Sequence, residues 1–501
     1  MATRLPSAEL FTAAELPLRD LSAAEQVDHQ LERSGALDAT DPAIRALIEL
    51  NPDAMSIAME RDTEVQNGTP RSPLHGLAVV VKDNIDTADS MLTTAGSLAM
   101  VADRPAHDAA VVSRLRDAGL VILGKSNLSE WAFFRSPHGL SGWSGRGGLT
   151  RNPWEPARSA GGSSSGSGAA VSAGISPLAV GTETDGSIIC PASYCGVVGF
   201  KPSASLLPSV GIVPISSIQD APGPMSRSVR LTAALLDVMS AGTTGGGSDA
   251  RFTSGIDDGA AGLRVGVVRD HFGSHAASDA VVESVLHQLG AAGVVLIDDV
   301  PAVKFPAPLE SDIERVLLYE FADGLTRYLA ERHQSAQRPL GPQSIAEIVA
   351  FNNAHAEQEL TWFGQEYLEQ AAALIAESTT PLDSDMYRST RERLDQLVRV
   401  EGLDSITGEH QLDALVSPAF PPAPLIDPIL GDYGDGGDCT TAPAVAGYPI
   451  LSVPVGFVGG LPVGLAVTGV PGSEATLLRL ARTVEVSLGL LEGGHLLAPS
   501  M

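Results

Sequence analysis

The sequence predicts an α/β fold, and three neighbouring segments carry that prediction. Residues 77–81 form a short apolar, β-branched run of the kind found in buried strands. Residues 106–118 place apolar side chains at helical spacing, and Gly119 ends the helix. Residues 120–123 form a second apolar strand. Strand, helix and strand in succession are typical of an α/β protein.

Further strands are expected on both sides of a long helical segment. Residues 309–408 are mostly helical in pattern and acidic, and strands are predicted both before and after them. We therefore expect one sheet built from distant segments and not a row of separate domains. The other expected elements are a helical segment over residues 20–62, helices at 228–240 and 473–487, and strands at 177–180, 263–268, 414–417, 450–455 and 464–467.

Composition excludes several classes of protein. The chain has 501 residues, of which 44% are hydrophobic, and a net charge of −28, so it is long and apolar enough to fold around a large core. The negative charge argues against nucleic acid or an anionic membrane as partner. No apolar run reaches membrane-spanning length and residues 1–20 lack a secretion signal, so a soluble, cytoplasmic location is expected.

Cys190, Cys195 and Cys439 are too few for a disulfide framework, and Cys190 and Cys195 lack the second ligand pair of a metal site.

Lysine is scarce, which draws attention to the few lysines present. The chain has four, Lys82, Lys125, Lys201 and Lys304, beside 28 arginines. Lys82 directly follows the predicted strand 77–81. It could pair with a nearby carboxylate in the ordinary way. Alternatively it could act as a neutral base if burial lowers its pKa from about 10.4 towards 7 or 8, a shift worth roughly 3 to 4 kcal/mol.

Two motif matches are weak because their local context is wrong. Residues 119–126 fit the P-loop pattern, but their middle residues are Leu, Val, Ile and Leu, which favour a strand over a phosphate-binding loop. Residues 162–166 fit the GxSxG elbow of α/β-hydrolases, yet Pro153 and Pro156 make the preceding stretch a poor strand. Downstream histidines such as His410 leave that second possibility open.

Two loops of small residues suit an oxyanion. Residues 159–174 are rich in glycine and serine, and residues 184–187 place a glycine beside a serine after a predicted strand. Small residues at the start of a helix packed on a sheet leave backbone N–H groups exposed. Such groups can stabilise a negatively charged oxygen.

Taken together, these segments resemble the amidase signature family. The segment GGSSSGSGAAVSAGISPLAVGTETDGSIICPASYCGVVGFKPS, residues 161–203, is similar to the family's glycine/serine-rich signature. PLHGLAVVVKDNIDT (73–87) is similar to its lysine segment, and residues 117–132 and 441–469 are similar to later strands and turns. The order of these matches along the whole chain makes the resemblance specific.

The resemblance implies a fold and a domain organisation. It implies an α/β/α fold with a large twisted mixed β-sheet core surrounded by helices, and no cofactor or metal. It also implies a single domain over residues 1–501. Its expected parts are N-terminal helices at about 1–65, a signature core at about 66–240, a mostly helical insert at about 300–410, and C-terminal strands and a helix at about 411–490.

By position in the family's motifs, the resemblance assigns a catalytic triad. Lys82 is the implied base, Ser163 is the bridging serine in a cis peptide bond, and Ser187 is the implied nucleophile. The implied oxyanion hole consists of the backbone N–H groups of Thr184, Asp185, Gly186 and Ser187.

Some positions depart from the common family pattern. Asp185 and Ser165 replace glycines, and Ile189 stands where many members carry arginine, which weakens the case for an acidic substrate. The first two departures resemble the members that act on peptide amides. Further segments that carry this resemblance are 49–55, 124–135, 141–154, 181–192, 214–229, 317–321 and 357–366.

The expected activity is hydrolysis of carboxamides through an acyl-enzyme on serine. The resemblance implies a small-molecule or peptide amide as substrate, with C-terminal peptide amides converted to the free acid and ammonia. Two alternatives stay open: a hydrolase of small aryl or alkyl amides, and the A subunit of a tRNA-dependent glutamyl amidotransferase. The sequence does not predict an oligomeric state.

Overall fold

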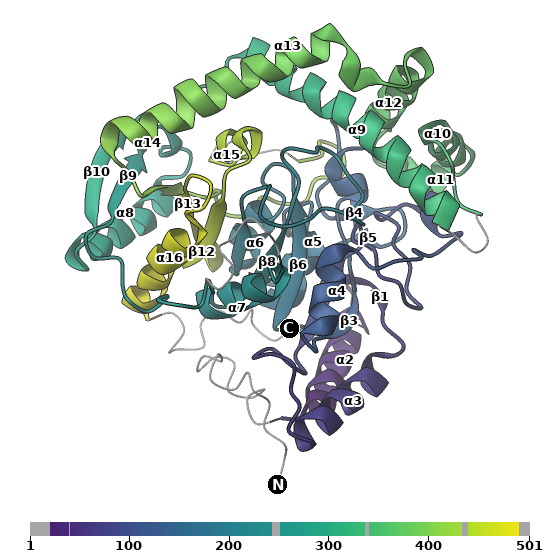
Figure 1. Cartoon of the computed structure of the whole chain (residues 1–501), viewed down its shortest axis with the longest axis horizontal. Helices are drawn as coiled ribbons and strands as arrows, with labels where there is room; N and C mark the ends of the chain where they lie inside the picture. Colours follow the sequence, from purple (N-terminus) through teal and green to yellow (C-terminus); the bar gives the residue numbers. More distant parts are fainter. Residues whose placement is uncertain (1–20, 40, 243–250, 336–339, 433–438, 490–501) are drawn as a thin grey trace.

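An eleven-stranded mixed sheet runs through the centre of the molecule (Figure 1). The structure is a computed structural model and describes residues 21–489 apart from residue 40 and residues 243–250, 336–339 and 433–438. The strand order is β1-β3-β2-β6-β8-β7-β12-β13-β11-β9-β10. The strands are β1 (Leu47–Leu50), β2 (Ala78–Lys82), β3 (Val121–Ser126), β6 (Leu178–Glu183), β7 (Val198–Lys201), β8 (Ala221–Ser226), β9 (Arg264–Val268), β10 (Val295–Val300), β11 (Ala414–Pro418), β12 (Ile450–Val458) and β13 (Leu461–Thr468).

Parallel pairing is concentrated in two parts of this sheet. β2 lies parallel to both β3 and β6, and β9 lies parallel to both β10 and β11. The pairs between these two parts are antiparallel, as are β1 with β3 and β6 with β8. β2 has the sequence AVVVK and all five residues are buried, as expected for a parallel strand covered on both faces. A separate two-stranded sheet joins β4 (Trp143–Ser144) to β5 (Gly148–Leu149).

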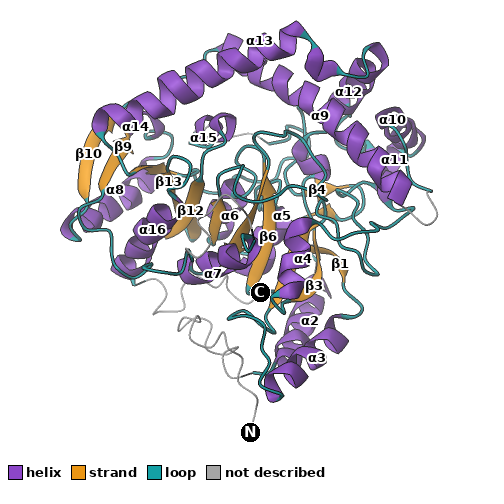
Figure 2. Ribbon diagram, viewed as in Figure 1, coloured by secondary structure: helices purple, strands orange, loops and turns teal. Residues whose placement is uncertain are grey.

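Helices surround the sheet (Figure 2). In one group α7 contacts α4 and α16, α16 contacts α8, and these helices pack against β3, β7, β8 and β12. α5 and α6 contact each other and the strands that lie from β3 to β13 in the sheet order. The helices of the N-terminal part and the core are α2 (Ala23–Ala39), α3 (Ala54–Gln66), α4 (Ala110–Asp117), α5 (Ser165–Ser172), α6 (Ile189–Cys195), α7 (Val229–Met239), α8 (Ala276–Ala291), α15 (Thr441–Ala446) and α16 (Glu474–Leu488).

A helical insert forms an arc over one side of the sheet, at the top of Figure 1. It comprises α9 (Ala307–Ser335), α10 (Ile345–Ala354), α11 (Ala356–Glu359), α12 (Glu366–Glu377), α13 (Asp385–Leu394), a π-helical stretch (Asp395–Asp404) and α14 (Ser405–His410). Phe134, from a loop of the core, packs between Phe321 of α9 and Tyr367 of α12, at centroid distances of 5.0 Å and 4.5 Å. These ring contacts fix the insert to the loops that follow β3.

The observed architecture confirms the expected α/β/α fold around a large mixed sheet. The expectation of helix throughout residues 20–62 is wrong at β1, which pairs antiparallel with β3 at the edge of the sheet. The apolar spacing of Ile44, Leu47 and Ile48 suits a short strand as well as a helix, so periodicity alone did not separate them. Residues 1–20, part of the expected N-terminal helices, lie outside the described residues.

One central strand was missed because of its prolines. β8 contains Pro222 and Pro224, and proline normally argues against an interior strand. The pairs that β8 makes with β7 involve Met225 and Ser226, whereas Pro222 and Pro224 pair with β6. In its proline-containing half, β8 therefore behaves like an edge strand.

Candidate active site

The parallel pairing of β2 and β6 brings two chemically important segments to one edge of the sheet. Lys82 is the last residue of β2, and Thr182 and Glu183 end β6. Because the carboxyl ends of parallel strands meet at the same edge, the lysine lies beside the loop that carries residues 184–187. The first glycine/serine loop, residues 161–164, leads into α5 nearby.

The Lys82 ammonium group is fully buried and has three oxygen partners. Its Nζ lies 2.7 Å from Ser163 Oγ, 2.9 Å from Thr182 Oγ1 and 3.1 Å from the Thr182 carbonyl oxygen. Asn84 donates a further hydrogen bond of 3.0 Å to Thr182 Oγ1. Two of the three partners are hydroxyls, which accept a hydrogen bond from an ammonium or donate one to a neutral amine.

Burial lowers the pKa of Lys82 to about 7, because a charged ammonium loses the solvation it would have in water. The negative charges of Asp220 and Glu183 oppose this shift. The shift expected for a lysine base is therefore found. Near neutral pH a large share of Lys82 is an uncharged amine that can accept a proton.

Ser163 contacts the lysine and directly precedes Ser164, whose backbone N–H bonds to the carbonyl oxygen of Ser187. The Gly162–Ser163 peptide bond is cis, as the family resemblance implies. The Ser163 side chain is fully buried, and its carbonyl oxygen accepts a hydrogen bond of 3.0 Å from the backbone N–H of Ser129. A Cβ atom on Gly162 would lie 2.3 Å from Ser129 Oγ, so glycine is required at that close approach.

Ser164 ties the two glycine/serine loops together. Its backbone N–H donates to the Ser187 carbonyl oxygen at 3.0 Å, and its hydroxyl donates to the Thr182 carbonyl oxygen at 3.0 Å. The hydroxyl also accepts from the Thr182 N–H at 3.2 Å. The central serine of the GxSxG-like stretch is therefore occupied with backbone contacts, and it does not follow a strand.

Ser187 sits on a loop whose backbone donors are free to bind an anion. Gly186 has a φ of +73°, a value that glycine adopts without strain, and Ser187 retains 7% of its exposure. Within the described part of the chain, the N–H groups of Thr184, Asp185, Gly186 and Ser187 have no hydrogen-bond acceptor. The loop thus offers the N–H groups that an oxyanion needs.

Glu183 and Asp185 hold this loop from its two sides. Glu183 Oε2 accepts hydrogen bonds from the N–H groups of Ile188 and Ile189 at the start of α6, at 2.6 and 2.9 Å. The Asp185 carboxylate accepts hydrogen bonds from the side chains of Thr440 and Thr441 next to α15, and burial raises its pKa. The family motif assigns only the backbone N–H of Asp185, and no sequence signal indicates this side-chain contact.

The other lysines differ from Lys82 in their surroundings. Lys201 is buried and donates to the Tyr448 carbonyl oxygen at 2.5 Å, and burial lowers its pKa to about 8. Lys125 is buried in β3 and bonds to backbone oxygens, which confirms that residues 119–126 do not form a phosphate-binding loop. Lys304 is exposed and pairs with Asp270 at 2.8 Å.

A metal site is not visible in the described residues. No group of three or more His, Cys, Asp or Glu side chains among them is arranged to hold a metal ion. Cys195 is buried and directs its thiol to the Ala160 carbonyl oxygen. None of the helices in the described part of the chain is long and apolar enough to cross a membrane.

This arrangement can move a proton and stabilise a negatively charged oxygen. A serine hydroxyl both donates and accepts hydrogen bonds, so Ser163 can pass a proton to neutral Lys82. Unpaired backbone N–H groups beside Ser187 can receive the oxygen that becomes negative when a carbonyl is attacked. These are the requirements of a serine hydrolase that does not use histidine.

The chain belongs to the Amidase family, whose model matches residues 31–478. It is an amidase, a hydrolase of amide bonds. A probable amidase of Arabidopsis thaliana is 34% identical over 97% of this chain and 92% of its own length. The A subunit of the glutamyl-tRNA(Gln) amidotransferase of Chloroflexus aurantiacus is 33% identical, with 94% of each chain covered.

Among solved structures, the native peptide amidase of Stenotrophomonas maltophilia superposes with a TM-score of 0.84. It is 42% identical, and the match covers 95% of each chain. This likeness confirms both the family and the fold that the sequence predicts.

Proposed function

We propose that this amidase converts C-terminal peptide amides to the free acid and ammonia through an acyl-enzyme on Ser187. The observation that carries the chemistry is the 2.7 Å contact between buried Lys82 and Ser163 beside the loop of Ser187. The substrate class is supported by the 42% identity to the Stenotrophomonas peptide amidase. The proposed reaction uses no cofactor.

In the first step Ser187 Oγ attacks the amide carbonyl carbon. A new C–O bond forms while the Ser187 proton passes to Ser163, and the Ser163 proton passes to neutral Lys82. The carbonyl oxygen becomes negative and accepts hydrogen bonds from the loop N–H groups. Removing one such donor typically slows an enzyme of this type by about 100- to 1,000-fold.

In the second step the same relay runs in reverse. The Lys82 ammonium returns a proton through Ser163 to the amide nitrogen, the C–N bond breaks, and ammonia leaves. An ester between Ser187 and the peptide remains. Water then attacks this ester and loses a proton to the relay, the bond between the acyl carbon and Ser187 Oγ breaks, the relay returns the proton to Ser187, and the free acid departs.

The test combines a nucleophile variant with a panel of substrates. Ser187→Ala and Lys82→Ala should abolish ammonia release, and Ser163→Ala should leave a small residual rate, with unchanged circular dichroism in each case. Ser113→Ala, on the exposed face of α4, is the matched control and should retain full activity. Full activity of Ser187→Ala would overturn the mechanism.

The panel separates the substrate classes. Purified protein should release ammonia faster from peptide amides than from benzamide, acetamide or glutamine. Higher activity on benzamide or acetamide would instead assign a small-amide hydrolase. In wild type, kcat/KM should rise as pH increases through about 7, because only neutral Lys82 accepts the serine proton. A profile that falls between about pH 6 and 9 without unfolding would contradict a lysine base.

A second candidate is supported by the 33% identity to the glutamyl-tRNA(Gln) amidotransferase A subunit. Such a subunit should release ammonia from glutamine and copurify with partner chains. Activity of the isolated chain on peptide amides, without activity on glutamine, would exclude this candidate.

A further inference from the structure

We propose that Asp220 is a positioning residue for amide hydrolysis. Through Thr184 it holds the loop that carries Ser187, and its carboxylate charge stabilises the ammonium that Lys82 becomes during the reaction. Asp220 lies between β7 and β8 and belongs to neither glycine/serine loop.

The contacts of Asp220 aim one carboxylate oxygen at the oxyanion loop. Thr184 Oγ1 donates to Asp220 Oδ1 at 2.6 Å. The backbone N–H groups of Ile215 and Ser216 donate to Oδ2 at 2.8 and 3.0 Å. Three donors on one carboxylate favour its charged form and fix its orientation. Thr184 is thereby anchored three residues before Ser187.

Two cavities meet at Asp220. A small one of about 10 Å³ is lined by Asn84, Thr182, Thr184 and Asp220, among others, and its volume suits a single water molecule. Thr182 is the residue whose hydroxyl and carbonyl contact Lys82 Nζ. A larger cavity of about 120 Å³ is lined by Asp220 together with Glu320 and Arg327, among others.

The charged groups around Lys82 and Asp220 determine how Asp220 affects the lysine. Lys82 faces the carboxylates of Asp220 and Glu183, and Asp220 has the larger effect on the lysine. From α9, Glu320 faces Asp220, while Arg327 is paired with Asp323. Burial, with a smaller contribution from Glu320, raises the pKa of Asp220 to about 6, so the carboxylate is charged at the pH where Lys82 begins to lose its proton.

This arrangement balances two needs of the relay. At rest Lys82 must be neutral, which burial favours. Once it has taken the serine proton it must be stabilised as an ammonium, which Asp220 favours. Thr184 belongs to the loop of residues 184–187 and is bonded to Asp220. The same carboxylate therefore also orients the backbone N–H groups proposed to bind the oxyanion.

The scarcity of lysine allows a direct test. In protein labelled with ¹³C at lysine Cε, four side-chain signals report the four lysines, and Lys82→Met identifies that of Lys82. In Asp220→Asn, the amide oxygen can still accept from the N–H groups of Ile215 and Ser216, and the amide NH2 can donate to the Thr184 hydroxyl, without the charge. We expect the Lys82 titration midpoint to fall by about one pH unit. The pH midpoint of the acid limb of kcat/KM should fall by the same amount.

Asp237→Asn is a matched control. Asp237 also accepts hydrogen bonds from two backbone N–H groups, of Phe252 and Thr253, and from the Thr253 hydroxyl, and burial raises its pKa. It lies on α7 and is not among the charges that act on Lys82. This variant should leave the Lys82 titration unchanged.

Thr184→Val separates the two roles of Asp220. It removes the contact with the loop but keeps the charge, so kcat should fall by up to about 100-fold while the Lys82 midpoint moves much less than in Asp220→Asn. Should Asp220→Asn not fold, Thr184→Val still tests the contact with the loop, and a kcat equal to that of wild type would overturn the positioning role.

A Lys82 midpoint that is equal in Asp220→Asn and wild type would overturn the proposal. The inference rests on Lys82 as the proposed base, and the two fail separately. If the Lys82 signal shifts in Asp220→Asn but the acid limb of the rate does not, the coupling stands and the role of Lys82 as base is wrong.

Discussion

Two buried lysines on neighbouring strands differ in the groups that contact their Nζ atoms. Lys82 ends β2 and Lys125 lies in β3, where Val81 pairs with Lys125 and Lys82 with Ser126. Both side chains are fully buried. Lys82 Nζ contacts two hydroxyls and one carbonyl oxygen. Lys125 Nζ contacts two backbone carbonyl oxygens and one hydroxyl and lies 3.6 Å from the Asp83 carboxylate.

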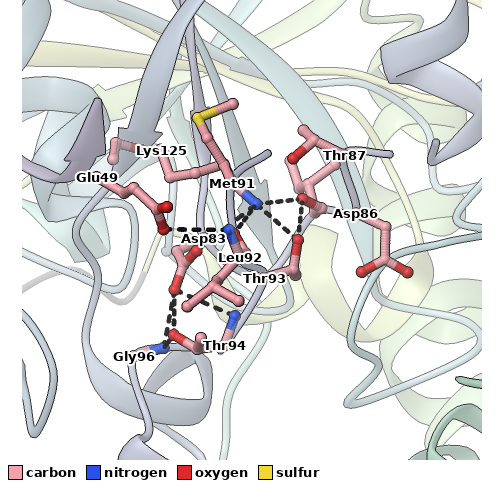
Figure 3. Close-up of polar contacts among 12 residues, drawn as sticks. Glu49, Asp83, Asp86, Thr87, Met91, Leu92, Thr93, Thr94, Gly96 and Lys125 are labelled. Carbon is pink, nitrogen blue, oxygen red and sulfur yellow. Dashed lines mark hydrogen bonds and ion pairs between the residues drawn. The ribbon is translucent and has the colours of Figure 1, made fainter. Parts of the chain in front are cut away.

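Figure 3 shows what Lys125 does in that position. Its ammonium donates hydrogen bonds to the carbonyl oxygens of Ile85 and Leu92 and to the Thr93 hydroxyl. These contacts close the loop that follows β2. The Asp83 carboxylate binds the other end of the loop, at the N–H groups of Thr94 and Gly96. Burial lowers the pKa of both lysines, so burial alone does not distinguish a base from a structural cation. The partners do.

Replacing each lysine with methionine should show whether it serves catalysis or stability. The largest effect is expected on the catalytic rate of Lys82→Met. Lys82→Met removes the proposed base, so kcat should fall by at least about 1,000-fold. The melting temperature should stay equal or rise, because an apolar side chain replaces a buried polar group. Ammonia release and a thermal melt measure the two quantities. A large loss of stability in Lys82→Met would remove the contrast with Lys125.

Lys125→Met should show the reverse pattern. It leaves two carbonyl oxygens without their cation and leaves Asp83 with Arg146, at 3.5 Å, as its remaining cationic partner. Removing one member of a buried ion pair costs roughly 3 to 5 kcal/mol of unfolding free energy. Urea unfolding measures this loss. Lys304→Met is the control, because its exposed ion pair with Asp270 contributes about 0 to 1 kcal/mol. Wild-type stability for Lys125→Met would show that the loop closes without the lysine.

The pH dependence of stability should sharpen the comparison further. The folded-state pKa of Lys82 is about 7, below its ordinary value of about 10.4 in the unfolded chain. Between these values the unfolded state binds the extra proton, so this group makes stability rise with pH, by about 1.4 kcal/mol per unit. Urea unfolding of wild type and Lys82→Met from about pH 7 to 10 measures the difference. A difference that is independent of pH would mean that Lys82 is charged in the folded protein.

Local motifs indicate the candidate triad, whereas the segment 214–229, which also resembles the family, assigns no role to Asp220 within it. Lys82, Ser163 and Ser187 stand in local patterns with a recognisable family resemblance. Asp220 approaches Thr184 only because β8 pairs antiparallel with β6. Such a contact depends on strand pairing between distant segments, which local periodicity does not report.

Backbone conformation was equally hard to anticipate. Trp131, Ala132 and Phe133 have φ values of 53°, 54° and 75°, although none of these residues favours the left-handed region. Tertiary contacts impose this turn: the Trp131 N–H donates to the Ala95 carbonyl oxygen, and Trp131 is buried against the insert. The composition of the segment contains no glycine or asparagine that would have indicated it.

The burial of three lysines has a consequence for handling the protein. Lys304, on the connection between β10 and α9, is the only lysine whose side chain is open to solvent, at 70% exposure. Amine-reactive reagents directed at lysine side chains would therefore modify one point on the surface. A dye coupled through a lysine side chain would therefore sit on that connection and leave the proposed base untouched.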